Sequence, residues 1–258
     1  MEPFFSPRRR LSKGVTLSLA LTLAVGLTGC QTETPASPSP RPTPSPTAEK
    51  DPSAARTAYA AVLRDLLQHL TLPDGTQLSQ EDILAEDLSA NTFALSDVDG
   101  DGREELVVLF STTYTAAMQG AILDYDMERG DTYLELLQFP SFTFYSNGYL
   151  KVYASHNQTD GAMWPYTLYQ YDPETDTYKE VAAMVYACDK EILESFGREA
   201  DYPQEADRSG IGTVYYVDST VPLDQEDYLA WESSWMGDAH EIVLNERSLT
   251  EENIAQLQ

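Results

Sequence analysis

The sequence predicts an α+β domain, in which a curled antiparallel β-sheet or a blade-like pair of hairpins is flanked by helices and follows a disordered tether. Aromatic and β-branched residues with closely spaced turn signals fill the middle of the chain, which is typical of antiparallel strands. Segments with the apolar spacing of helices lie before and after this region. With 258 residues, 42% of them hydrophobic, the chain can bury the core of one ordinary domain.

The net charge disfavours two kinds of partner, nucleic acids and anionic membrane surfaces. The chain has 16 basic and 42 acidic residues, which gives a net charge of −26 at pH 7. A surface this acidic repels phosphate backbones, so we expect no nucleic-acid partner. An anionic membrane surface is repelled for the same reason. Cations are therefore the natural partners of the domain.

Residues 1–29 have the organisation of a lipoprotein signal peptide. A basic start at residues 8–13 precedes the uncharged stretch 15–25, which is too short to span a membrane comfortably. The following Leu27-Thr28-Gly29-Cys30 resembles the bacterial lipobox, in which the cysteine is acylated and becomes the new N-terminus. The resemblance implies a lipid anchor at Cys30, on the outer face of the bacterial cell membrane. An ordinary cleaved signal peptide with a chance cysteine is the alternative.

Residues 30–52 are expected to be the lipidated cysteine and a linker. Seven prolines alternate there with Ser, Thr and Ala. Because proline favours the extended polyproline II conformation, the segment predicts a semi-rigid spacer. We therefore expect three parts: a signal peptide at 1–29, the anchor and linker at 30–52, and a single globular α+β domain at 53–258.

The domain is expected to begin with helices. Apolar side chains recur on one helical face over 53–70: Tyr59, Val62, Leu63, Leu66, Leu67 and Leu70. This spacing predicts an amphipathic helix that packs on the sheet. A short second helix is expected over 80–88, because Ser79 with Asp82 three residues later forms a capping signal.

Eight strands are expected in the Tyr-, Phe-, Val- and Thr-rich middle of the chain. Their predicted ranges are 92–96, 105–112, 118–126, 132–139, 142–145, 149–154, 164–171 and 177–187. A weak repeat places Tyr125-Asp126 and Tyr171-Asp172 at a distance of 46 residues, each followed by Asp-Thr-Tyr. Such a period occurs in propeller blades, although common hairpin composition explains it equally well. Two or three hairpins cannot close a propeller.

The C-terminal part is expected to be mixed. Residues 201–210 have the composition of a polar loop, and 211–217 that of a strand. A helix is expected to start near Asp224. It would carry aromatic residues on one side: Tyr228, Trp231 and Trp235. Leu249-Thr250 with Ile254 predict a capped final helix.

One motif, at residues 97–105, carries chemistry. Its first, third, fifth and ninth positions are acids: Asp97, Asp99, Asp101 and Glu105. Gly102 permits a sharp turn, so that the carbonyl of Arg103 can also face a central ion. Calcium takes about six to eight such oxygens, and carboxylates this close repel one another without a cation. No His or Cys is nearby, which disfavours zinc. The motif predicts a Ca²⁺ site, with an acidic turn that holds no ion as the alternative.

The motif differs from an EF-hand, because Val108 stands at its twelfth position and strands are expected on both sides. Asp-x-Asp-x-Asp-Gly-x-x-Glu-Leu between strands resembles the calcium hairpins of FG-GAP and VCBS repeats, which carry the motif many times where this chain has it once. The resemblance implies the following ligands: the side chains of Asp97, Asp99 and Asp101, the carbonyl of Arg103, and Glu105 as closing carboxylate. With the lipobox and linker, the whole chain also resembles Firmicute-type surface lipoproteins.

No catalytic signature is found in the sequence. It has no Gly-x-Ser-x-Gly elbow, no His-Glu-x-x-His and no phosphate-binding glycine loop. A thiol dyad of Cys188 with a histidine would lack any local signature. The three tryptophans and the 16 tyrosines could form a sugar-stacking surface, although such aromatic residues are more often core.

These observations predict a lipid-anchored surface protein whose calcium-stabilised domain is a binding module for a cell-wall, glycan, peptidoglycan or protein partner. A structural or assembly subunit of an envelope complex is the first alternative. A hydrolase that uses two carboxylates is the second, since acids are the only plentiful catalytic groups. An enzyme is the less expected outcome.

Overall fold

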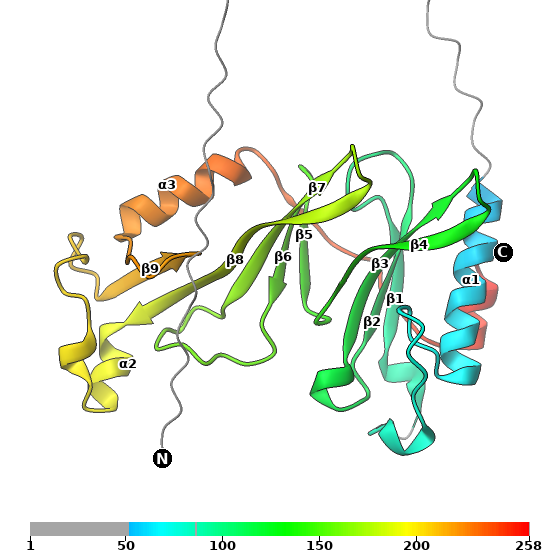
Figure 1. The fold of residues 1–258 in the computed structure, drawn as a ribbon, viewed down its shortest axis with the longest axis horizontal. Coiled ribbons are helices and arrows are strands. Elements are labelled where there is room, and N and C mark those ends of the chain that lie inside the picture. Colours follow the sequence, from blue (N-terminus) through cyan, green and yellow to red (C-terminus); the bar gives the residue numbers. More distant parts are fainter. Residues whose placement is uncertain (1–51, 86, 258) are drawn as a thin grey trace, which may run out of the picture. The chain divides into compact units, whose positions relative to one another are not determined.

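The computed structural model describes residues 52–85 and 87–257. The expected signal peptide, Cys30 and the linker as far as residue 51 lie outside the described residues. Two antiparallel β-sheets form the centre of the described chain, with α1 against the first sheet and α3 beside the second (Figure 1). The predicted α+β class and its antiparallel strands are therefore confirmed.

The first sheet has five strands in the order β11-β1-β2-β3-β4. Their bounds are β1 (Thr92–Ser96), β2 (Glu105–Phe110), β3 (Gln119–Asp126), β4 (Asp131–Gln138) and β11 (Arg247–Ser248). Strands β1 to β4 are consecutive in the chain and each pairs with the next. The sheet is thus a four-strand meander, to which a segment near the C-terminus adds an edge strand.

The second sheet repeats this plan with six strands in the order β10-β5-β6-β7-β8-β9. Their bounds are β5 (Phe142–Tyr145), β6 (Tyr149–Tyr153), β7 (Tyr166–Asp172), β8 (Thr177–Asp189), β9 (Thr213–Val217) and β10 (Glu241–Ile242). Strands β5 to β8 again form a consecutive meander, and β10 pairs with its first strand. Because β10 and β11 follow one another, a single C-terminal segment extends both sheets.

The eight strands predicted in the middle of the chain are all present, as β1 to β8, and the predicted strand at 211–217 is β9. The turn at Ser146–Gly148 also forms, since the Gly148 amide donates to the Tyr145 carbonyl at 3.0 Å and Gly148 has φ +77°. The sequence did not predict β10 and β11. Each is two residues long and is defined by its distant partner strand.

Four α-helices are described: α1 (Pro52–His69), α2 (Lys190–Ser195), α3 (Gln225–Met236) and α4 (Glu251–Ala255). The predicted helices at 53–70, from Asp224 and after Leu249 are confirmed, and the Thr250 side chain caps α4 by accepting from the Asn253 amide. The short α2 was not predicted. In the described part of the chain, no helix is both long and apolar enough to span a membrane.

The helix expected over 80–88 does not form as predicted. Over the residues described here, 80–85 and 87–90, the helical turns are the 3₁₀ turns Gln80–Asp82 and Leu88–Ala90. The predicted cap is present, because the Ser79 amide donates to the Asp82 carboxylate at 2.8 Å. The next residues leave the helical path, since the Leu84 amide donates to the Thr112 carbonyl at 2.8 Å. In this conformation Ile83 and Leu88 pack against the first core, whereas Leu84 is 70% exposed.

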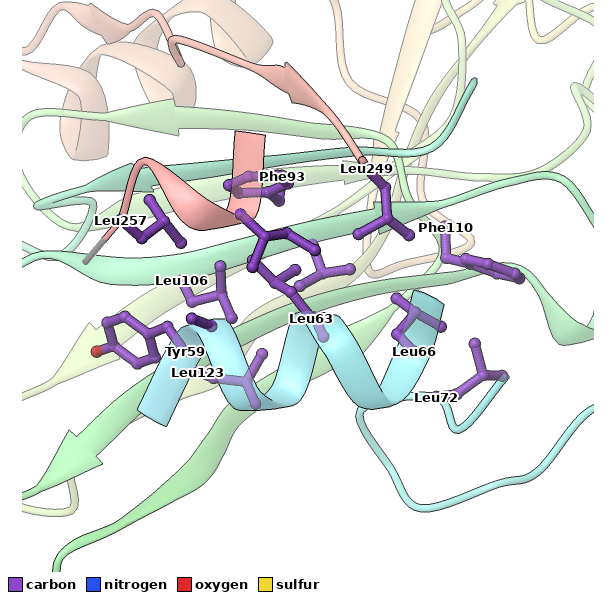
Figure 2. Packing of buried hydrophobic residues seen from close by; sticks show 14 of the residues in the cluster. Tyr59, Leu63, Leu66, Leu72, Phe93, Leu106, Phe110, Leu123, Leu249 and Leu257 are labelled. Atoms are coloured by element: carbon purple, nitrogen blue, oxygen red, sulfur yellow. The ribbon is translucent and has the colours of Figure 1, made fainter. Parts of the chain in front are cut away.

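The first hydrophobic core lies between α1, α4 and one face of the first sheet. Figure 2 shows the α1 side chains Tyr59, Leu63 and Leu66 together with Leu106 and Leu123 of the sheet. All five are almost completely buried. Burial of one such side chain contributes about 1.5–3 kcal/mol, so this face attaches α1 firmly to the sheet.

A second core lies between the two sheets. From the opposite face of the first sheet it contains Val107 and Ile122, and from the second sheet Leu150, Tyr169 and Tyr178. Successive residues of β2 therefore point alternately to α1 and to the second sheet. Both faces of this strand are covered, which explains its nearly uninterrupted apolar run from Leu106 to Phe110.

A third core attaches α3 to the second sheet. Tyr228 and Trp235 of α3 are buried there, as the core interpretation of the aromatic residues predicted. The Lys151 ammonium of β6 lies 4.6 Å from the Tyr166 ring centroid and 3.2 Å from the Glu232 carboxylate of α3. This buried cation therefore holds the helix to the sheet through an ion pair and a cation–π contact.

Candidate metal centre

The predicted calcium loop connects β1 to β2 at one end of the first sheet. The two Asp97 oxygens accept hydrogen bonds from the Gly100 amide at 2.8 Å and the Gly102 amide at 3.1 Å. Both glycines have positive φ, +86° and +88°, which other residues rarely adopt. The loop therefore folds tightly around the Asp97 carboxylate, with the sharp turn that was expected at Gly102.

Two predicted ligands, Asp99 and Glu105, are buried. Asp99 is 8% exposed and Glu105 is completely covered. One oxygen of each has a donor: Asp99 Oδ1 accepts from the Asp101 amide at 2.8 Å, and Glu105 Oε2 accepts from the Val98 amide at 2.9 Å. The other oxygens, Asp99 Oδ2 and Glu105 Oε1, are buried without any hydrogen-bond donor.

The remaining two predicted ligands, Asp101 and Arg103, interact with each other. Asp101 accepts from the Arg103 amide at 2.7 Å and from the Arg103 Nε at 2.6 Å. The Arg103 guanidinium continues to Asp124 of β3, at 2.7 Å, and to Asp176 in the β7–β8 turn, at 3.3 Å. The side chain of Arg103, for which only a carbonyl role was predicted, is thus a counter-ion for three acids.

Glu135 of β4 is a further buried acid, which the sequence analysis missed. It is 4% exposed, and neither of its carboxylate oxygens has a donor. One oxygen atom from each of Asp99, Glu105 and Glu135 lies within 4.8 Å of the other two. These three residues are called the inner trio below. Asp97, Asp99 and Asp101 meet the same distance limit and are called the outer trio.

A β-bulge places Glu135 in the inner trio. Ile122 of β3 pairs with Leu136, but its neighbour Leu123 pairs with Leu134, so Glu135 is an extra residue in β4. Leu134 packs with the first core and Leu136 with the second, on opposite faces of the sheet. Regular alternation would have placed both leucines on one face, and Glu135 alone on the other. The only local signal was an acid between leucines, and the bulge depends on pairing with β3.

Asp124, Glu135 and Asp176 form a third group of acids within the same limit. Asp124 and Asp176 differ from Glu135 because they have donors. Tyr133 lies with its hydroxyl 2.9 Å from Asp124 and 2.6 Å from Asp176, and Tyr171 donates to Asp176 at 2.6 Å. Arg103 also forms ion pairs with Asp124 and Asp176, so its guanidinium already balances negative charge in the third group. Of the described acids in these groups, only those of the inner trio keep unpartnered oxygens.

The electrostatics of the inner trio agree with this geometry. Burial, together with a smaller effect of the neighbouring carboxylates, raises the pKa of Asp99 to about 6, that of Glu105 to about 9 and that of Glu135 to about 10. Hydrogen bonds from the Asp101 amide and the Tyr171 hydroxyl moderate the rise at Asp99. A charged carboxylate that loses water without gaining a donor is strongly disfavoured. The groups therefore need either protons or a cation.

The donor chemistry favours a hard cation. Each of the three groups of described acids consists of carboxylates alone, without a histidine or cysteine. Oxygen ligands suit calcium, magnesium or manganese, whereas zinc prefers nitrogen and sulfur. The acids of the inner trio thus fit the type of ion that the sequence predicted.

The cysteine and the tryptophans that the sequence analysis considered differ in their burial. Cys188 is buried beside Leu193 and Val214, and burial raises the pKa of its thiol, which disfavours a reactive thiolate. Trp235 is core, whereas Trp164 is 47% exposed. The burial of Cys188 and of Trp235 therefore fits a structural role for each of them.

Comparisons with protein-family models, with curated proteins and with solved structures find no match for this chain. The similarity to FG-GAP and VCBS hairpins and to surface lipoproteins therefore stays a prediction. The function has to be argued from the geometry of the chain itself.

Proposed function

We propose that this protein is a lipid-anchored protein on the outer face of the bacterial cell membrane, whose extracytoplasmic domain binds structural Ca²⁺. One observation carries the metal part of the proposal. Two acids of the predicted loop, Asp99 and Glu105, are buried with one unpartnered oxygen each. A buried carboxylate oxygen without a donor costs free energy, which a cation at that position offsets.

Calcium is the cation that fits best. The 97–105 loop offers several carboxylates and backbone carbonyls, and calcium accepts such irregular oxygen sets more readily than magnesium. Extracellular calcium modules bind with Kd of about 10⁻⁴–10⁻³ M. Binding at this strength stabilises a domain where free calcium is millimolar, as it is outside a cell.

The domain is proposed to act as a binding module for a cell-wall, glycan or protein partner. The lipobox-like Cys30 and the proline-rich linker support a position some distance from the membrane. The acidic composition disfavours nucleic acid and anionic lipid as partners. We also propose that the two four-strand meanders are blade-like, as the repeat of Tyr125-Asp126 and Tyr171-Asp172 in the β3–β4 and β7–β8 hairpins suggests.

An assembly subunit of an envelope complex is the second candidate. Val181 and Met184 of β8 are 45% and 48% exposed, so the second sheet carries apolar side chains that another protein could cover. The hydrolase alternative has less support, because the acids with the most strongly raised pKa, Glu105 and Glu135, are buried out of reach of a substrate.

The test of the metal site is a thermal melt of residues 51–258, which contain every contact described above. The melt is run in chelator and in millimolar calcium, for the wild type, Asp99→Ala, Asp101→Ala and the exposed control Asp238→Ala. We expect calcium to raise the midpoint of the wild type and the control, and the loop variants to lose this shift. A wild type that calcium does not shift would reduce residues 97–105 to an acidic turn.

The partner is tested separately by a peptidoglycan and glycan pull-down in calcium. Retention above that of a tethered unrelated domain supports the binding module. Equal retention would favour the assembly role instead.

A further inference from the structure

We infer that the cation is held between the two sheets, with Glu135 of β4 as a ligand beside Asp99 and Glu105, and that calcium thereby fixes the second sheet onto the first. This inference rests on the proposed calcium site and extends it beyond the loop. It assigns a ligand to a strand that the calcium motif does not include.

The first support is the state of the Glu135 side chain. It is more than nine-tenths buried, has no donor on either oxygen, and lies within 4.8 Å of Asp99 and Glu105, one oxygen from each acid being counted. Asp124, one strand away, is buried as deeply but has Tyr59, Tyr133 and Arg103 as partners. Of these two buried acids, Asp124 thus has hydrogen-bond and ion-pair partners, whereas Glu135 has no donor.

The second support is the number of free oxygens. Asp99 Oδ2, Glu105 Oε1 and both oxygens of Glu135 lack donors. Calcium takes about six to eight oxygens and often one carboxylate in bidentate form. The inner trio thus supplies four of the about six oxygens that calcium needs at least. A bidentate Glu135 would have the role that the twelfth-position glutamate has in an EF-hand. Here the twelfth position is Val108, which is buried in the first core.

The third support is the contact of the second sheet with the loop. The Tyr178 hydroxyl of β8 donates to the Val98 carbonyl at 3.1 Å. Gly148, in the β5–β6 turn, lies so close that an added Cβ would be 3.4 Å from the Asp99 carbonyl oxygen. Arg103 reaches Asp176 in the β7–β8 turn. Two turns of the second sheet therefore contact the same loop that offers its carboxylates to the ion.

Through these contacts, binding of the cation by the inner trio affects how the second sheet is held. A cation draws Asp99 and Glu105 toward Glu135 and holds the loop in the conformation that Tyr178 and Gly148 contact. Without a cation, the three acids either take up protons or repel one another, and we expect the loop to be less ordered. Local stability of the β5–β6 and β7–β8 turns then falls, because part of their docking surface moves.

The experiment uses the full-length chain in detergent micelles and calcium alone as the ligand. The variants are Glu135→Gln, which keeps the size of the side chain, Asp99→Asn in the loop, and Glu128→Gln as the matched control. Glu128 is an exposed acid in the turn of the same hairpin. Calcium affinity is measured by calorimetry, and backbone hydrogen exchange is measured in chelator and in calcium.

We expect Glu135→Gln and Asp99→Asn each to weaken calcium binding tenfold or more, and Glu128→Gln to bind like the wild type. Calcium should slow exchange in the β5–β6 and β7–β8 turns of the wild type and the control, but not in Glu135→Gln. Circular dichroism in chelator checks the fold of each variant. If Glu135→Gln does not fold, Glu135→Asp keeps the charge but withdraws it by one methylene, and the same loss of affinity is expected.

The outcomes separate this inference from the proposed function. Wild-type affinity in Glu135→Gln with loss in Asp99→Asn would overturn the role of Glu135 and leave the loop site intact. Slowed exchange confined to residues 97–105 would overturn the coupling to the second sheet. A wild type that binds no calcium would remove the proposed site itself.

Discussion

The guanidinium of Arg103 lies 2.7 Å from the carboxylate of Asp124, measured from Nη2 to Oδ2, and the side chain of Asp124 is only 2% exposed. The same guanidinium nitrogen is 3.3 Å from Asp176, in the turn between β7 and β8. One side chain of the predicted calcium loop therefore connects the first sheet to the second.

Removal of the Arg103 guanidinium should destabilise the domain. Arg103→Met leaves the buried Asp124 without its positive partner, and we expect the free energy of unfolding to fall by about 1–3 kcal/mol. Arg129→Met is the control, because Arg129 is 84% exposed and its pair with Asp126 contributes little. Urea unfolding of residues 51–258 measures both variants. Equal stability of Arg103→Met and wild type would contradict the role of Arg103.

The attachment of α1 provides a second prediction. The Tyr59 hydroxyl donates to the Glu104 carbonyl at 3.0 Å and lies 3.1 Å from Asp124 Oδ1, and the residue is 1% exposed. Tyr59→Phe keeps the ring in the first core but removes the hydroxyl and its polar contacts with Glu104 and Asp124. We expect a loss of about 1 kcal/mol in urea unfolding. Tyr114→Phe, at a residue that is 47% exposed, should be neutral; a similar loss there would show that the effect is not specific.

The raised pKa values of the buried glutamates predict a pH dependence in chelator. The pKa of Glu105 is raised from 4.5 to about 9 and that of Glu135 to about 10, mainly by burial. For a carboxyl whose pKa is higher in the folded state than in the unfolded state, the free energy of unfolding is highest below the pKa of the unfolded state. It falls as the pH rises from that pKa to the pKa of the folded state. Without calcium, the urea midpoint should therefore fall between pH 4.5 and 9.

Two comparisons make this prediction specific. Glu105→Gln cannot ionise, so its midpoint should fall less steeply over the same range. Millimolar calcium should also reduce the slope, because the ion stabilises the charged carboxylates. A midpoint in chelator that rises with pH in this range would contradict the raised pKa values.

The buried thiol predicts protection from modification. Burial raises the pKa of Cys188, and the nearby Asp160 and Asp189 raise it further. The thiolate that reacts with alkylating agents is therefore disfavoured while the domain is folded. In residues 51–258, where Cys188 is the only cysteine, alkylation at neutral pH should follow the unfolded fraction across a urea titration. Rapid modification of the folded domain would show that the thiol is accessible.

The predictability of the elements depended on how local their signals were. The spacing of Tyr59, Leu63 and Leu66 predicted α1, and composition with turn residues predicted β1 to β8 and β9. The signal at Ser79 and Asp82 predicted a helix and was wrong, because a cap contributes too little to extend a helix when the next residues bond to a distant segment, as the Leu84 amide does to the Thr112 carbonyl. The two-residue strands β10 and β11 had no signal of their own, because each depends on its partner.

The sequence by itself determined the candidate calcium loop, since its acids and glycines are neighbours in the chain and their spacing alone makes the turn. Only the tertiary structure brought Glu135 to Asp99 and Glu105 and gave Arg103 its partners in both sheets. A bulge in β4 and the packing of two meanders decide these contacts. Both depend on pairing between distant residues, whose geometry no local pattern contains.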